Sequence, residues 1–211
     1  MDLHNYIAYF TIAFLTITSP GAAILLAISN GLRYNKKAVV VSTLANATGL
    51  FILSTVAFLG VGALLKTSMM FYIVLKILGA LYLIYLGIKL MIKKELPLHI
   101  DKELRVKNIN YYKVAKTAFL VAISNPKPIL FFTAIFPLFM SPNYSLLGQF
   151  FIMTGTFLAI SITSLITYGF LSNKFSHYFT NTKRLSIFNK ITGALFIAMG
   201  SVMAIYSRKA N

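Results

Sequence analysis

The amino-acid sequence predicts an all-helical integral membrane protein, with six transmembrane helices in a 3+3 inverted repeat whose first and fourth helices are interrupted. Three observations support this fold class. Hydrophobic residues make up 58% of the 211 residues and charged residues only 11%, whereas a soluble domain carries about 25% charged residues. The apolar residues form six continuous runs, and the two halves of the chain resemble each other. Barrel strands are not expected, because they alternate in polarity.

The six apolar runs are each long enough to cross a bilayer as a helix, which takes about 20 residues. They cover residues 7–27, 39–62, 70–91, 114–140, 146–171 and 187–206. The N-terminus has no basic region and no clear cleavage signal, so we interpret the first run as a retained span.

Basic residues orient these spans. The first, third and fifth connections hold fourteen Lys and Arg residues, against three on the opposite side. Basic connections stay in the cytoplasm, so we expect both termini outside. The net charge of +16 is therefore assigned to membrane orientation and not to nucleic-acid binding. Residues 93–113 form a charged cytoplasmic linker between a first three-helix repeat, 1–92, and a second, 114–211.

The two repeats are related by constant shifts. A shift of 106 residues places Pro20 on Pro126 and residues 48–51 on 154–157, and a shift of 114 places residues 76–81 on 190–195. Because each half has three spans, the second half enters the membrane from the other side. Inverted repeats of this kind are common in alternating-access transporters, with the substrate site where interrupted helices meet.

Each repeat contains a break in its first span, at Ser19-Pro20-Gly21 and at Asn125-Pro126-Lys127-Pro128. Proline lacks an N–H group and crowds the preceding turn, so it interrupts a helix. One proline alone would indicate a simple kink, but paired breaks favour a substrate site. Its predicted core consists of Ser19, Pro20, Gly21, Asn125, Pro126 and Lys127.

Lys127 is a cation inside a span, which costs about 2.5–3.5 kcal/mol on insertion scales. It either binds a substrate carboxylate or is a structural cation satisfied by freed carbonyls or lipid phosphate. Asn125 either mends the broken helix or binds the ligand. Asn46, Thr48 and Ser161 are further candidate substrate-binding residues, and each is alternatively an interhelical contact. Four glycines are expected to be packing positions: Gly79, Gly87, Gly193 and Gly200.

The spans hold no acidic residue or histidine near their centres. The acidic residues are Asp2, Glu95, Asp101 and Glu103, all outside the runs, and the chain has no cysteine. We therefore expect no metal site, no cofactor and no enzymatic activity.

Several stretches resemble the LysE/RhtB family of bacterial amino-acid exporters, most closely its homoserine/threonine type. They are Ser19-Pro20-Gly21 with Asn30-Gly31-Leu32-Arg33, residues 75–87, and Asn125-Pro126-Lys127 with Phe136-Pro137. The resemblance implies a multi-pass protein of the bacterial inner membrane. It also implies export of threonine, homoserine, homoserine lactone or leucine against inward proton movement, and a role in transport for the broken spans.

Two departures limit this resemblance. The family's common Pro-Gly-Pro is Pro20-Gly21-Ala22 here, which leaves the break intact. Many members carry an acidic residue after the glycine matching Gly49 or near Ser161, and this chain has Leu50 and Ser161. Proton coupling would then fall to Lys127, to the substrate's own ionisable groups or to water. The missing acid also argues against lysine or arginine as substrate, since nothing would neutralise a cationic side chain.

The sequence therefore predicts an exporter of small neutral amino acids that works by alternating access among membrane lipids. Two alternatives stay open: a non-transporting membrane scaffold, which needs no paired helix breaks, and a passive channel for small solutes. A homodimer is compatible with the sequence, which gives no direct sign of oligomeric state.

Overall fold

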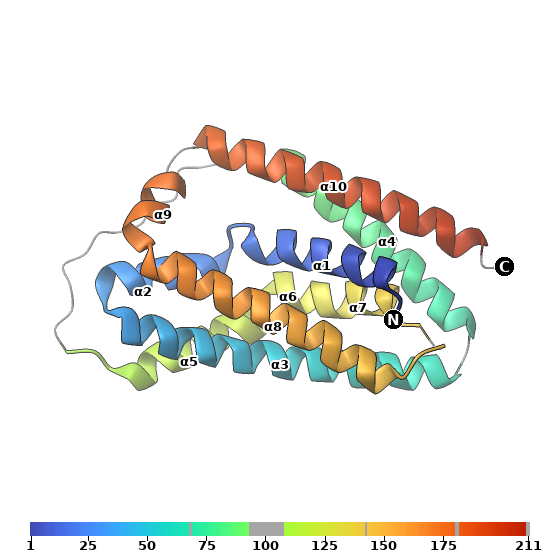
Figure 1. The fold of residues 1–211 in the computed structure, drawn as a ribbon, viewed down its shortest axis with the longest axis horizontal. Coiled ribbons are helices and arrows are strands. Elements are labelled where there is room, and N and C mark those ends of the chain that lie inside the picture. Colours follow the sequence, from blue (N-terminus) through green and yellow to red (C-terminus); the bar gives the residue numbers. More distant parts are fainter. Residues whose placement is uncertain (68, 93–107, 142, 180–181, 210–211) are drawn as a thin grey trace.

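The structure, a computed structural model, describes residues 1–67, 69–92, 108–141, 143–179 and 182–209. Every regular element in these ranges is a helix (Figure 1), so the all-helical prediction is confirmed. Three described helices are long and apolar enough to cross a membrane alone: Lys36–Gly60, Leu146–Phe170 and Ser186–Ile205. The count rises to five when each of two bent helix pairs is taken as one span. These helices are those of a multi-pass membrane protein.

The first predicted span consists of α1 (Leu3–Thr18) and α2 (Ala22–Arg33), which are bent by 50° at a short break. A tight turn leads into α3 (Lys36–Thr67), where the Asn35 side chain accepts a hydrogen bond from the Ala38 N–H at 2.9 Å. α4 (Met69–Ile92) follows and contains the shorter apolar stretch Ile77–Ile92. The helix boundaries in this half therefore enclose the predicted apolar runs.

The fourth predicted span is also broken, with a bend of 42° between α5 (Tyr111–Ser124) and the segment that begins at Pro126. That segment contains α6 (Pro126–Leu130), the π-helical turn η1 (Phe131–Ile135) and α7 (Phe136–Phe139). The sequence did not predict η1. It ends two residues before Pro137, whose missing N–H cannot bond to the carbonyl four residues earlier, and this favours irregular winding there.

α8 (Leu146–Phe170), α9 (Ser172–Phe179) and α10 (Thr182–Lys209) complete the chain. The sequence did not predict α9, because its residues are too polar to form an apolar run. Most of the predicted linker lies outside the described residues, and α5 already begins at Tyr111 within its last residues. The start of α1 and the end of α10 lie at the same end of the bundle, while the α2–α3 turn and α9 lie at the other (Figure 1).

Small residues allow the helices to approach closely. α4 packs along α10, and a Cβ atom added to Gly87 or Gly193 would lie 2.5 Å from the other glycine's carbonyl oxygen. An added Cβ at Gly200 would lie 2.8 Å from the Ala80 carbonyl, and one at Gly79 would overlap the Ala134 carbonyl. The predicted packing role of these four glycines is confirmed.

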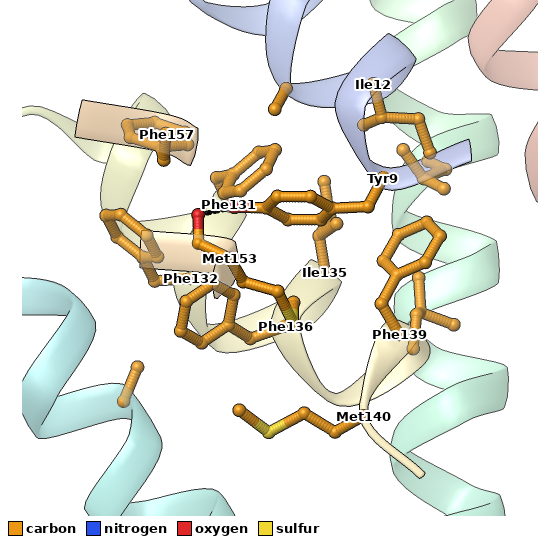
Figure 2. Close-up of a cluster of buried hydrophobic side chains, with 14 of the residues drawn as sticks. Tyr9, Ile12, Phe131, Phe132, Ile135, Phe136, Phe139, Met140, Met153 and Phe157 are labelled. Carbon is orange, nitrogen blue, oxygen red and sulfur yellow. Dashed lines mark hydrogen bonds between the residues drawn. The ribbon is translucent and has the colours of Figure 1, made fainter. Parts of the chain in front are cut away.

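Two hydrophobic cores hold the bundle together. The larger one surrounds Tyr9, whose ring lies among those of Phe131, Phe136 and Phe139 (Figure 2). The Tyr9 hydroxyl is satisfied inside this core, because it donates to the Met153 carbonyl at 2.7 Å. The smaller core lies between α2 and α8 and contains Ile24, Ala27, Ile28 and Leu165.

Candidate functional site

The first break is held by contacts from elsewhere in the chain. At the end of α1 the Ser19 N–H donates to the Leu15 carbonyl at 3.2 Å. Gly21 is the extended N-cap residue of α2 and has no side chain to cap the helix. The N–H groups of the first turn of α2 therefore have no partner within their own helix. The Thr18 carbonyl accepts from the Tyr168 hydroxyl at 3.1 Å.

The second break is closed by its own residues. Only Asn125 separates α5 from α6, and its side-chain oxygen accepts from the Lys127 N–H at 3.1 Å. Pro126 is the first residue of α6, a position where a helix makes no use of an N–H group. The Asn125 side chain therefore caps α6 across the break.

Lys127 joins the two breaks. Its ammonium nitrogen donates to both the carbonyl and the hydroxyl oxygen of Ser19, each at 2.8 Å, across 108 residues of sequence. A Cβ atom added to Gly21 would lie 3.9 Å from the same nitrogen. The ammonium is thus held beside the N-terminal end of α2, which carries a partial positive charge of its own. An anionic group placed there would be stabilised by both.

A cavity of about 50 Å³ lies where the breaks meet α3 and α8, large enough for a few water molecules. It collects six of the nine residues that the sequence predicted for the site: Ser19, Gly21, Asn46, Asn125, Lys127 and Ser161. Ser161 occupies the middle of a stripe on α8, with Phe157 one turn before it and Leu165 one turn after it. Helical spacing of four residues places all three on one face.

Three predicted site residues do not line this cavity: Pro20, Thr48 and Pro126. Thr48 is exposed, and its hydroxyl donates to the Leu44 carbonyl at 3.0 Å. It follows Asn46 by two positions, and two helical steps rotate a side chain by about 200° to the far side of α3. Pro126 is exposed at the start of α6.

Sequence reasoning missed Thr16 and the apolar lining residues Leu50 and Phe157. Thr16 precedes Ser19 by three positions and so shares its helix face, a signal that was available once Ser19 had been chosen. The oxygens of the Thr16 hydroxyl and the Asn46 amide are buried and have no hydrogen-bond partner within the described part of the chain.

The cavity lies between the two hydrophobic cores. On one side Phe157 lines it and packs against Phe131 and Phe132, with ring centroids 4.7 Å apart in both pairs. On the other side Ile24 and Leu165 line it and belong to the smaller core. Polar groups from both helix breaks are therefore enclosed between two apolar layers.

The site thus consists of two broken helices joined by a lysine in an otherwise apolar bundle. Comparison with known protein families places this site in context. A model of the LysE type translocator family matches residues 14–207. The chain belongs to this family. The match includes both breaks and the cavity between them, so the resemblance noted from short motifs is confirmed over nearly the whole chain.

Full-length relatives are found in several bacteria. A membrane protein of Bacillus subtilis called YrhP, described as uncharacterized, is 30% identical over 204 residues, which cover 94% of this chain and 97% of that protein. The homoserine/homoserine lactone efflux protein of Salmonella typhimurium is 28% identical over 204 residues, 97% of this chain and 98% of that protein. An uncharacterized membrane protein of Vibrio cholerae has the same identity and coverage. No solved structure matches this chain.

Proposed function

We propose that the protein exports small neutral amino acids or their derivatives across the bacterial inner membrane by alternating access. The observation that carries this proposal is the contact of the two helix breaks through Lys127 and Ser19 inside an apolar bundle. The substrate class is that of homoserine, homoserine lactone, threonine and leucine. It is supported by family membership and by relatives in two Salmonella strains that are named for homoserine and homoserine lactone efflux.

Lys127 is the anchor for the substrate's carboxylate or carbonyl group. Its ammonium and the first turn of α2 both favour negative charge at the same place. Asp2 is the only acidic residue in the described part of the chain, and it caps the far end of α1. That end lies about 24 Å from the break, given the rise of a 16-residue helix. An arriving carboxylate therefore meets no competing side-chain carboxylate from the described residues.

The site must widen to hold a substrate. Its cavity measures about 50 Å³, whereas pockets that hold small-molecule ligands usually measure about 300–1,000 Å³. Binding therefore requires the breaks to move apart, and Lys127 exchanges its bonds to Ser19 for bonds to the substrate. The contact that joins the repeats is given up as the substrate enters.

The aromatic core around Tyr9 forms the barrier on the side of the termini. Tyr9 lies on α1 between its start and the break, and its ring packs against those of Phe131 and Phe136 (Figure 2). Exposed basic residues gather at the other end, where Lys36 and Lys37 follow the α2–α3 turn. The cytoplasm lies at that basic end, because positive connections stay inside. Both termini are then outside, and the aromatic core must separate for release.

The inverted repeat is supported by which helices pack together. In an inverted repeat, the first span (α1 and α2) corresponds to the fourth (which begins with α5), and α3 corresponds to α8. The packing of α1 and α2 against α8 should then be matched by packing of α5 against α3, and both contacts are extensive. The α4–α10 pair maps onto itself under the same correspondence. With α4 as a span, six spans result, in two units of three.

Counterflow in proteoliposomes tests the proposal. Labelled homoserine, threonine and leucine are each offered to vesicles loaded with the unlabelled amino acid, with intact protein and with Lys127→Ala. We expect saturable exchange of at least one of them by the intact protein and its loss in the variant. Flux without saturation or counterflow would indicate a channel, and no exchange by correctly folded protein would indicate a scaffold.

Proton coupling has no acidic carrier in the spans, so we assign it to no carboxylate. The same vesicles test it when export is measured with and without an imposed proton gradient. An export rate that does not change when the gradient is collapsed would rule coupling out.

A further inference from the structure

We infer that Asn46 and Thr16 form a subsite for the α-ammonium group of the substrate, so that an amino acid binds as a zwitterion between these oxygens and Lys127. The inference rests on the proposed function and deepens it. It assigns a chemical role to two side chains, one of which, Thr16, was not among the predicted site residues.

Asn46 provides the stronger evidence for this subsite. Asn46 is only 3% exposed, and its amide oxygen has no hydrogen-bond partner within the described part of the chain. A carbonyl oxygen can only accept hydrogen bonds, and buried polar atoms in folded proteins are nearly always bonded. The residue lines the cavity with Lys127. The cavity therefore offers an acceptor that an occupant with N–H groups would satisfy.

Thr16 differs from its neighbours on α1. Thr11 and Thr18 donate their hydroxyls to carbonyls four residues earlier, at 2.8 and 2.7 Å, a common way for a helical threonine to be satisfied. Thr16 is 3% exposed, and its buried hydroxyl is not satisfied in this way or by another described residue. Three other buried threonine hydroxyls also lack partners among the described residues, at Thr43, Thr154 and Thr192, but these residues do not line the cavity. Thr16 lines it, as Asn46 does.

The cavity also presents donors. The Lys127 ammonium donates to both oxygens of Ser19, and the first turn of α2 adds backbone N–H groups. The Ser161 hydroxyl, which also lines the cavity, can donate or accept. An occupant must therefore accept hydrogen bonds in one part of the cavity and donate them in another. An α-amino acid does both within three bonds of one carbon atom. Its side chain then meets Leu50, Phe157 and Leu165, which suit an apolar or small neutral group.

The test uses pairs of ligands that differ only in the amino group. Unlabelled L-homoserine and its 2-hydroxy analogue, 2,4-dihydroxybutanoate, compete against labelled homoserine counterflow, with threonine or leucine pairs used in the same way if those are transported. Asn46→Leu removes the acceptor at nearly constant volume, Thr16→Val removes the hydroxyl at constant shape, and Thr16→Ser restores it. Thr55→Val is the matched control on α3, because its hydroxyl bonds to the Phe51 carbonyl and does not line the cavity.

We expect Asn46→Leu to weaken competition by homoserine about tenfold to a hundredfold, the loss for a hydrogen bond to a charged group. Competition by the hydroxy analogue should change less than about threefold. Thr16→Val should act in the same direction, and Thr16→Ser and Thr55→Val should match the intact protein. The subsite is overturned if a variant weakens competition by homoserine and by the hydroxy analogue equally. It is also overturned if either Asn46→Leu or Thr16→Val leaves competition by homoserine unchanged. Both results leave the proposed exporter function standing. Failure of the intact protein to exchange any amino acid overturns both.

Discussion

The two helix breaks occupy equivalent places in the two halves of the chain, yet they are held in different ways. The second break is closed within four residues, by the Asn125 side chain and by prolines at positions that need no N–H group. The first break has no side-chain cap at Gly21. Two of its carbonyl oxygens are instead satisfied by Tyr168 and Lys127, from distant helices.

This difference separates a fixed element from a dependent one. A break that satisfies itself keeps its geometry when its neighbours move, whereas a break held by tertiary contacts changes when those contacts are exchanged. The backbone of Lys127 is part of the self-satisfied second break. Its side chain supports the first break, which depends on tertiary contacts. A ligand that captures this one ammonium therefore acts directly on the opposite repeat. The following predictions test that division, from the largest expected effect to the smallest.

Lys127→Ala removes both the anchor and the support of the first break. We expect counterflow to fall at least a hundredfold, because the substrate can no longer form charge-assisted hydrogen bonds with the ammonium, each worth about 1.5–3 kcal/mol. Lys116→Ala, an exposed lysine on α5, is the control and should transport normally. Normal counterflow by Lys127→Ala would show that the lysine neither binds the substrate nor supports the first helix break.

Asn125→Ala removes the cap of the second break. It should lower the free energy of unfolding by about 1 kcal/mol, the usual value of an N-cap side chain. Asn125→Ser retains a capping oxygen and should recover most of that loss. Unfolding of the detergent-solubilised protein measures both variants. An Asn125→Ala protein as stable as the intact one would mean that this break, too, depends on distant contacts.

Tyr168→Phe removes one distant support of the first break and leaves the ring in place. We expect a loss of about 0.5–1.5 kcal/mol in unfolding, since the Thr18 carbonyl loses its hydrogen bond. Tyr144→Phe, an exposed tyrosine in the connection before α8, should change nothing. Identical melting curves for the two variants would remove Tyr168 from the account of the break.

Gly21→Ala should have the smallest effect of the series. A Cβ atom there would lie 3.8 Å from Lys127 Cδ, an ordinary contact, and its extended backbone is open to any residue. The free energy of unfolding should not fall, and should rise by about 0.4–1 kcal/mol, because alanine restricts the unfolded chain. Gly31→Ala is the contrast, because its Cβ would overlap the Gly169 carbonyl and cost about 1–3 kcal/mol. If Gly21→Ala and Gly31→Ala lowered the free energy of unfolding equally, the open space beside Gly21 would be contradicted.

The positions of the breaks could be read from the sequence because proline acts locally on the helix that contains it. The partner of Lys127 could not, since Ser19 lies 108 residues away and a freed carbonyl and a substrate were both acceptable partners. Helical spacing explains the rest. Asn46 and Thr48 are both polar, but two residues apart on a helix they face different ways. Thr16 has no distinguishing pattern in the sequence, because it is a single threonine in an apolar run.

The elements that the sequence did not predict have physical causes of a similar kind. α9 is too polar to be found as an apolar run, and η1 depends on how the chain accommodates Pro137 within a packed aromatic core. Charge counts and apolar length are properties of composition, so they predicted the membrane class. Winding and contact partners are properties of tertiary packing, and the structure was needed to show them.

The most direct test of the account compares Ser19→Ala with Lys127→Ala in their affinity for homoserine, measured by titration calorimetry in detergent. Ser19 competes with the substrate for the Lys127 ammonium, so removal of its hydroxyl should tighten binding about two- to tenfold, the equivalent of one hydrogen bond. Lys127→Ala should weaken binding at least tenfold. Equal weakening in both variants would contradict the exchange of Ser19 for substrate and would leave Lys127 as a structural cation between two fixed helices.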